Sequence, residues 1–345
     1  MNKKKDLNEV SENKVLSLWG DIFSRNPDQI NKIHQSDSEL VSFFPNGEDL
    51  IAVSTDTMEE EIALGFYDSP ESIGFAAVMA SVSDLAAVGA SPIGIVCSLS
   101  LTNEYRPEVM RSRLAQGIEK ACKQLGTFVL GGDTNWSDRL AISVTAIGRT
   151  SKSDARLRTL MEEGDYLYST GLFGLGSVRA GLKILNIKSE TISKELFPIA
   201  RLKEGMFLSQ FASAMMDTSD GLMSALDQLS RVNNCGFKLS LSIKDLIRPD
   251  LIQTIEQLNL PPLTFLASEV GEYELVFTIK PSVHDDFIKA SHLNGFKFFN
   301  LGKATHDTEI YSLDRKIETL LFRQLYSDRD LTTQVLMERL VSLCK

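Results

Sequence analysis

Six aspartates set in short patches of small residues constrain this chain more than any other feature of its sequence. Asp37 is the first, and each of the other five interrupts or ends an apolar or small-residue run: Asp56, Asp84, Asp133, Asp217 and Asp220. Carboxylates are rarely buried without a partner, and no Lys or Arg stands beside any of these in the sequence. A shared cation is the natural partner. Magnesium, which takes a few carboxylates and completes its shell with waters and substrate phosphates, fits best.

Length and composition predict two domains that handle small molecules. A chain of 345 residues is long for one core, and 43% hydrophobic residues suffice to bury two. The net charge of -10 argues against a nucleic-acid-binding surface, which normally carries a basic patch. The basic start at residues 1–6 is followed by a polar stretch, and no apolar run is long enough to span a membrane. We therefore expect a cytoplasmic protein without nucleic-acid or membrane partners.

The cysteines and histidines form no catalytic or metal-binding pattern. The four cysteines lie too far apart for a zinc-type pair, so we interpret them as reduced. The four histidines stand in polar surroundings. A serine or cysteine nucleophile activated by a histidine base is therefore poorly supported.

Apolar periodicity predicts an α+β fold in two halves, residues 1–150 and 151–345. Expected helices cover 11–34, 72–89 and 107–125, and the second is rich enough in small residues to pack closely against a sheet. Expected strands are 50–54, 93–101, 128–130, 140–148, 165–170, 237–241 and 274–279. A glycine loop at 171–177 precedes a helix from 178, and another helix starts near Asp220. Residues 149–158 are interpreted as the linker between the halves.

Several of these motifs can be explained either by local structure, such as a helix cap or a turn, or by a role in ligand binding. In residues 217–222, Ser219 or Asp220 could cap the following helix, or the two aspartates could hold a cation and a phosphate at its N-terminus. Residues 131–134 could be a plain turn, or a place where the backbone passes close to a ligand with Asp133 aimed at it. The glycine loop could be a simple strand-helix turn or a phosphate-binding loop, although it matches neither the Walker nor the dinucleotide fingerprint.

Two other aspartates favour a ligand role more strongly. Asp84 lies in a run of alanines, where an unpaired charge is costly if it is buried. Asp56 lies between Thr55 and Thr57 at the expected end of a strand. Both positions suit a carboxylate that reaches a bound cation.

Taken in order, the motifs resemble thiamine-monophosphate kinases, which belong to the superfamily of aminoimidazole ribonucleotide synthetase and selenophosphate synthetase. The matching segments are 54–57, 82–92, 131–134, 163–171, 217–222 and 273–278. The element Ser219-Asp220-Gly221-Leu222 points to the kinase branch in particular. The resemblance implies a homodimer that pairs through its N-terminal sheets, with a C-terminal α+β domain packed against each.

The resemblance also implies a reaction and the residues that serve it. ATP and magnesium would occupy the cleft, and the γ-phosphoryl group would pass directly to a substrate phosphate. Such chemistry depends on positioning and charge neutralisation more than on a protein nucleophile. The implied metal ligands are Asp37, Asp56, Asp84, Asp133 and Asp220, with Asp133 and Asp220 also catalytic. The implied nucleotide-binding residues are Thr55, Gly132, Asp133, Thr134, Arg158 and Ser219.

The departures from the family pattern fall mainly on the acceptor side. The family's Gly-Asp-Asp motif reads Gln35-Ser36-Asp37 here, and its substrate-side histidine is replaced by Ala63. Glu61 adds bulk and charge where the family has glycine. Two alternatives therefore stay open: a paralogue that phosphorylates another metabolite, and a catalytically weak nucleotide-binding protein with a regulatory or assembly role.

Overall fold

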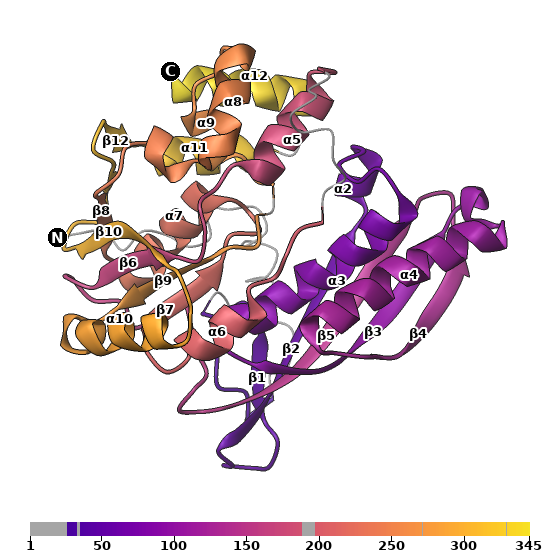
Figure 1. Ribbon diagram of the computed structural model, residues 1–345, viewed down its shortest axis with the longest axis horizontal. Coiled ribbons are helices and arrows are strands. Elements are labelled where there is room, and N and C mark those ends of the chain that lie inside the picture. The colour runs from indigo at the N-terminus through magenta and orange to yellow at the C-terminus, as the bar shows by residue number, and fades with distance from the viewer. Residues whose placement is uncertain (1–25, 33–34, 188–196, 271, 329) are drawn as a thin grey trace.

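The computed structural model describes residues 26–345 apart from 33–34, 188–196, 271 and 329 (Figure 1). The described chain forms an α+β fold built on one five-stranded and one seven-stranded sheet. Most of the helix predicted over residues 11–34 lies outside the described residues. Its described part, residues 26–32, is not helical, and Gln29 forms a β-bridge with Val41. The prediction is wrong there because this segment pairs with a strand.

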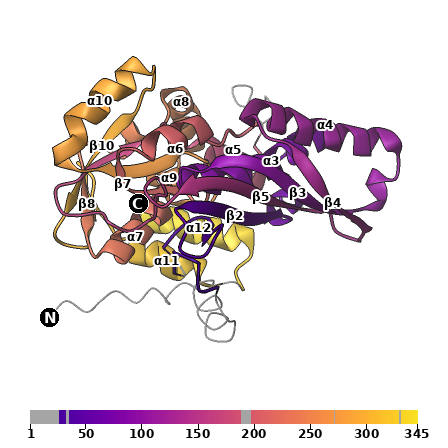
Figure 2. The ribbon, with the colours of Figure 1, turned by 90° about the horizontal axis from the view of Figure 1, so that it is seen from below.

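The first sheet has the order β1-β2-β5-β3-β4. Its strands are β1 Glu39–Ser42, β2 Asp49–Met58, β3 Ser91–Leu101, β4 Val129–Trp136 and β5 Ala141–Ser151. Neighbouring strands are antiparallel except β3 and β4, which are parallel. Both views place β4 at the outer edge of the molecule (Figures 1 and 2). Asp56 lies inside β2 and not at a strand end, because β2 continues to Met58.

Helices α3 (Pro70–Ala87) and α4 (Glu108–Leu125) lie side by side on one face of this sheet (Figure 1). Ser69 and Ser72 form a capping box that starts α3. A Cβ atom added to Gly117 of α4 would lie 2.0 Å from the carbonyl oxygen of Glu71, so the two helices pack as closely as the small residues predict. Every residue of α3 is buried except Glu71 and Asp84.

The second sheet has the order β12-β11-β8-β10-β6-β9-β7. Its strands are β6 Tyr166–Ser169, β7 Ala212–Asp217, β8 Gly236–Leu239, β9 Leu275–Ile279, β10 Phe299–Thr305, β11 Ile310–Tyr311 and β12 Lys316–Ile317. The remaining helices are α2 Glu60–Ala63, α5 Leu175–Ile184, α6 Leu202–Leu208, α7 Leu222–Asn233, α8 Ile252–Leu258, α9 Leu263–Ala267, α10 His284–Leu293, α11 Thr319–Tyr326 and α12 Thr333–Cys344.

Two apolar cores hold the structure together. One joins α3 and the first sheet to residues of the second half, such as Met215 of β7 and Phe277 of β9. The other lies between the second sheet and α5, α7, α9, α11 and α12. The first core therefore brings the end of β7 against α3. Asp84, one of the two residues of α3 that are not buried, lies at this contact. Among the described residues, no helix combines the length and apolar character needed to cross a membrane.

Candidate active site

Three carboxylates from distant parts of the chain meet where α3 approaches the end of β7. Asp37 precedes β1, Asp84 lies on α3, and Asp217 is the last residue of β7. One ligand oxygen from each lies within 4.8 Å of the other two. Clustered carboxylate oxygens are the ligands preferred by hard divalent cations. The residue types and their spacing therefore fit a magnesium-type ion.

Asp37 is fixed by a two-point ion pair with Arg158. The Arg158 Nε and Nη2 atoms donate to the two Asp37 carboxylate oxygens at 3.1 and 2.8 Å. Asp37 therefore has a basic partner, although no Lys or Arg stands beside it in the sequence. The partner stands far away in the sequence and reaches the site only through folding. Asp37 keeps lone pairs for a cation because each carboxylate oxygen accepts more than one interaction.

Serine hydroxyls orient the other two carboxylates. Ser54 of β2 donates to Asp84, and Ser83 of α3 donates to Asp217 at 2.6 Å. The Ser219 hydroxyl donates to the other Asp217 oxygen at 2.9 Å. These bonds position both carboxylates without neutralising them. A positive charge is still needed to offset their repulsion.

The pKa values of Asp84 and Asp217 also indicate that these carboxylates repel one another. Burial, followed by the charges of Asp56, Asp217 and Asp37, raises the pKa of Asp84 well above its ordinary value. Burial and the charge of Asp37 raise the pKa of Asp217 to about 7. Both groups are easier to protonate than an ordinary aspartate, because burial and neighbouring anions disfavour the ionised form. A bound divalent cation would reverse this effect.

Asp56 lies beside this cluster, and both Asp56 and Asp220 lie near Glu61 of α2. Burial, and then the charges of Glu60, Asp56 and Asp220, raise the pKa of the Glu61 carboxyl. Asp220 itself is exposed. Glu61, which stands where the family has glycine, therefore adds a carboxyl group beside two of the predicted metal ligands.

Thr55 and Asp133 lie on the other face of the first sheet. Strand register places Thr57, Ser143, Ser98 and Asp133 in one row across β2, β5, β3 and β4. Thr55 is on the same face, with its hydroxyl 3.0 Å from that of Thr145. Asp56, one residue along β2, instead faces α3 and Asp84. A single copy of the chain therefore does not bring Asp133 to the cluster of Asp37, Asp84 and Asp217.

Residues 131–134 form part of the edge strand β4 and not a turn, so the turn interpretation is wrong. A Cβ atom on Gly132 would lie 2.0 Å from the carbonyl oxygen of Cys97, so only glycine lets β4 pair this closely with β3. Gly132 and Thr134 are exposed and help to line a shallow hollow of about 490 Å³ beside α4. The Asn135 side-chain nitrogen donates to Asp133 at 2.7 Å.

The structure also bears on the two motifs at helix starts, residues 217–222 before α7 and the glycine loop before α5. Gly221 is the N-cap of α7, with no side-chain cap, and the Ser219 side chain bonds to Asp217 instead. The capping explanation is therefore wrong for Ser219. At the glycine loop, the Gly174 and Gly176 N–H groups donate to the Glu272 carboxylate at 3.0 and 3.1 Å. These donors already bind the Glu272 carboxyl group, so a phosphate role for the loop is not supported.

Sequence reasoning missed several residues that complete the site. Ser54 was detectable, because it stands two positions before Asp56 in a strand and so shares its face. The hydrogen bond from Ser83 to Asp217 gave no comparable signal, because the two residues lie far apart in the sequence.

The fold and part of the acidic cluster are similar to those of a known class of proteins, the aminoimidazole ribonucleotide synthetase-related proteins. The family model "AIR synthase related protein, N-terminal domain" matches residues 35–150. The structure named "AaThiL complexed with AMPPCP and TMP" superimposes with a TM-score of 0.74 at 20% identity, covering 92% of this chain and 98% of that chain. At this identity the likeness concerns the fold.

Two curated relatives make the assignment more specific. The thiamine-monophosphate kinase of Buchnera aphidicola subsp. Acyrthosiphon pisum is 34% identical over 284 residues, which cover 79% of this chain and 84% of the relative. That of Archaeoglobus fulgidus is 30% identical over 269 residues, covering 76% of this chain and 85% of the relative. The chain belongs to the thiamine-monophosphate kinase family.

Proposed function

We propose that this chain is an ATP-dependent phosphotransferase that transfers the terminal phosphoryl group of ATP to thiamine monophosphate or a related phosphorylated metabolite. The observation that carries the proposal is the convergence of Asp37, Asp84 and Asp217 within 4.8 Å in a member of this kinase family. The site offers no activated nucleophile, which suits direct transfer between two bound substrates.

A magnesium ion would be held by Asp37, Asp84 and Asp217, with Asp56 and Asp220 available to a second ion beside them. When bound, it would neutralise the triphosphate and the developing charge on the transferred group. Arg158 holds Asp37 in place through two hydrogen bonds. Ser54 and Ser83 fix the orientations of Asp84 and Asp217, so the carboxylates are positioned before any ligand arrives.

The nucleotide-binding roles of Thr55, Gly132, Asp133, Thr134, Arg158 and Ser219 remain part of this proposal. Arg158 and Ser219 contact the acidic cluster directly. Thr55 and Asp133 lie on the outward face of the first sheet. A homodimer that pairs through this face would place them at an interface between two copies, where both chains could contribute to one site.

We predict that the protein is a dimer whose interface includes β4. Phe128 and Trp136, at the two ends of this edge strand, expose 69% and 49% of their surface, and a second copy would bury them. Light scattering should give twice the 38.3 kDa chain mass, and Phe128→Glu should shift the protein to monomer. Leu293→Glu, at an 82% exposed position on α10, is the control and should leave the dimer intact. A monomeric wild type would contradict the prediction.

The proposed activity is tested by ADP release from ATP with thiamine monophosphate as acceptor. We expect turnover with magnesium and none in excess chelator, because clustered carboxylates repel a bare triphosphate. Turnover in chelator would contradict the shared-cation site. Efficient ATP binding without phosphorylation of any supplied acceptor would favour the regulatory alternative.

Ala63 and Glu61 favour a second candidate function, the phosphorylation of a different acceptor. Ala63 is exposed on α2 and offers no polar contact, and Glu61 brings a carboxyl group near Asp56 and Asp220. We therefore expect thiamine monophosphate to be a weak acceptor and Ala63→His to improve its kcat/KM. A low-micromolar KM for thiamine monophosphate in the wild type would show that these departures carry little weight.

Two further expectations accompany the proposal. We propose a domain boundary after residue 150, since β5 completes the first sheet at Ser151 and the second sheet begins at Tyr166. The cytoplasmic location stays a prediction.

A further inference from the structure

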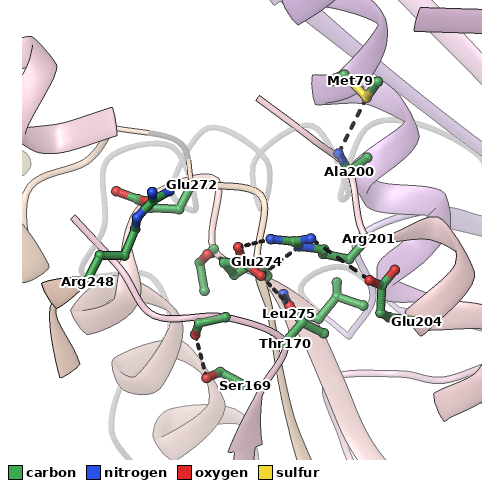
Figure 3. Close-up of polar contacts among 12 residues, drawn as sticks. Met79, Ser169, Thr170, Ala200, Arg201, Glu204, Arg248, Glu272, Glu274 and Leu275 are labelled. Carbon is green, nitrogen blue, oxygen red and sulfur yellow. Dashed lines mark hydrogen bonds and ion pairs between the residues drawn. The ribbon is translucent and has the colours of Figure 1, made fainter. Parts of the chain in front are cut away.

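Arg201 and Glu274 form an ion pair between two segments that are far apart in the sequence. Arg201 is the residue before α6, and Glu274 is the residue before β9. The Arg201 Nε atom donates to one Glu274 carboxylate oxygen at 2.8 Å, and its Nη2 atom donates to the other (Figure 3). The Glu274 side chain is only 9% exposed. A two-point pair at a largely buried carboxylate fixes the geometry of both partners.

The segment that carries Arg201 is packed on α3, the helix of Asp84. The Ala200 N–H group donates to the Met79 Sδ atom of α3 at 3.4 Å (Figure 3). A Cβ atom on Gly205 of α6 would lie 2.1 Å from the carbonyl oxygen of Ala86, so the two helix backbones are in direct contact. Arg201 therefore takes its position from α3.

Glu274 is bonded to the residue that follows Asp217. The Thr218 N–H group and hydroxyl donate to the Glu274 carbonyl oxygen at 2.9 and 3.0 Å. Strand register also pairs Asp217 with Leu275, the first residue of β9. The position of Glu274 therefore determines where the backbone of Asp217 lies.

Thr170 couples the side chain of Glu274 to the start of β9. Its hydroxyl donates to the Glu274 carboxylate at 2.6 Å and accepts from the Leu275 N–H group at 2.8 Å. A Cβ atom on Gly171 would lie 2.5 Å from the same carboxylate, so glycine is required beside it. A shift of the carboxylate would therefore disturb the bonds that hold the first residue of β9.

Two connections thus run from α3 to Asp217. In the direct one, the Ser83 hydroxyl donates to the Asp217 carboxylate at 2.6 Å. The other passes through Arg201 and Glu274 to the backbone beside Asp217. The first orients the carboxylate, and the second fixes the backbone from which it projects. Cation affinity depends on both, because magnesium demands near-ideal ligand geometry and the groups that hold its ligands set that geometry.

We propose that Arg201 and Glu274 are positioning residues for the acidic cluster, and that their ion pair sets the place of Asp217 relative to Asp84. The pair thereby determines how tightly the cluster holds a divalent cation. This inference rests on the cation site of the proposed function. Glu274 itself is not a ligand of that site, because its carboxylate is bonded to Arg201 and Thr170.

Titration of the nucleotide-free protein with manganese(II), with the free ion followed by electron paramagnetic resonance, measures cation affinity separately from turnover. Manganese accepts the same oxygen ligands as magnesium. Asp84→Asn identifies the relevant binding event, which it should weaken. We expect Glu274→Gln and Arg201→Met each to weaken the same event about 10-fold, a usual cost of disturbing the groups that support metal ligands.

The signs of these changes distinguish positioning from a simple effect of charge. Glu274→Gln removes a negative charge and Arg201→Met removes a positive one, so a purely electrostatic effect would change cation affinity in opposite directions. Positioning predicts weaker binding in both variants. The double variant should bind no more weakly than either single variant, because the two residues act as one unit.

Arg201→Lys keeps the charge but loses the two-point geometry. We expect it to fold and to weaken manganese binding about threefold, whereas an effect of charge alone would leave the affinity unchanged.

Asp227→Asn is the matched control for a general loss of stability. Asp227 is also a buried carboxylate of the second half, and it accepts from Arg231 at 2.8 Å and from Thr319 at 2.7 Å. Its partners lie on α7 and α11 and not on β9. Asp227→Asn should lower stability in denaturant melts, as Glu274→Gln does, and leave manganese affinity at the wild-type value.

The outcomes separate this inference from the proposed function. A wild type that binds no manganese, or that binds it as tightly after Asp84→Asn, would overturn the proposed cation site. Wild-type affinity in Glu274→Gln and in both Arg201 variants, or opposite changes in Glu274→Gln and Arg201→Met, would overturn the inference alone. An equal loss of affinity in Asp227→Asn would do the same, because the effect would then follow from stability.

Discussion

Asp84→Asn is expected to lower phosphoryl transfer by at least about a hundred- to a thousand-fold, the usual cost of removing a group that stabilises transition-state charge. Asp84 lies within 4.8 Å of Asp37 and Asp217 through its ligand oxygen, so the substitution removes one charge from the proposed cation site. The asparagine side chain has the same shape and can still accept the hydrogen bond from Ser54.

The fold is expected to survive this substitution and to gain stability in the absence of a cation. Burial and three neighbouring carboxylates already raise the pKa of Asp84, so a neutral amide relieves repulsion. Steady-state kinetics and thermal melts with and without magnesium measure both effects. Asp138→Asn, at an exposed turn after β4, is the matched control and should change neither. Full activity in Asp84→Asn, or an unfolded variant, would reassign Asp84 to a structural role.

Without magnesium, the protein is expected to be more stable at pH 5.5 than at pH 8. The pKa of Asp84 is raised in the folded state, and that of Asp217 is raised to about 7. A carboxyl whose folded pKa lies above its unfolded value contributes stability that is fully present below about pH 4 and is lost as the pH rises through the folded value. The loss therefore falls mainly between about pH 4 and the folded pKa near 7. Because one pKa unit corresponds to about 1.4 kcal/mol, the difference should reach a few kcal/mol.

Magnesium is expected to reverse this trend, because it binds the ionised carboxylates and competes with protons. Its stabilising effect should therefore be larger at pH 8 than at pH 5.5. Denaturant melts at several pH values, with and without magnesium, measure how stability depends on pH and how much magnesium adds at each pH. Asp217→Asn should flatten the magnesium-free profile. Stability that rises with pH in the absence of metal would contradict the assigned cause.

Local sequence patterns predicted much of the fold and of the site. The small-residue run that forms α3 (Pro70–Ala87) and the strand run that forms β3 (Ser91–Leu101) were found to within two residues of their observed ends. Asp84 stood out because a charge in such a run has no local explanation. The family motifs identified the kinase family, which the curated relatives confirm.

The hydrogen-bond and ion-pair partners of the site residues could be found only in the tertiary structure. Contacts between residues far apart in the sequence produce no local sequence pattern. Arg158 reaches Asp37, Ser83 reaches Asp217, and Glu272 fills the glycine loop that resembled a phosphate site.

Which aspartates share a site depends on strand register and helix packing. Adjacent side chains on a strand point to opposite faces, so register sends Asp56 toward α3 and Asp133 to the outward face. Helix α3, packed against both halves, brings Asp84 to Asp217 across 133 positions of sequence (217 minus 84). Residue types and spacing thus determined the chemistry available to this chain, because a carboxylate that becomes buried in an apolar run requires a polar or charged partner. Only packing between distant segments decided which carboxylates meet.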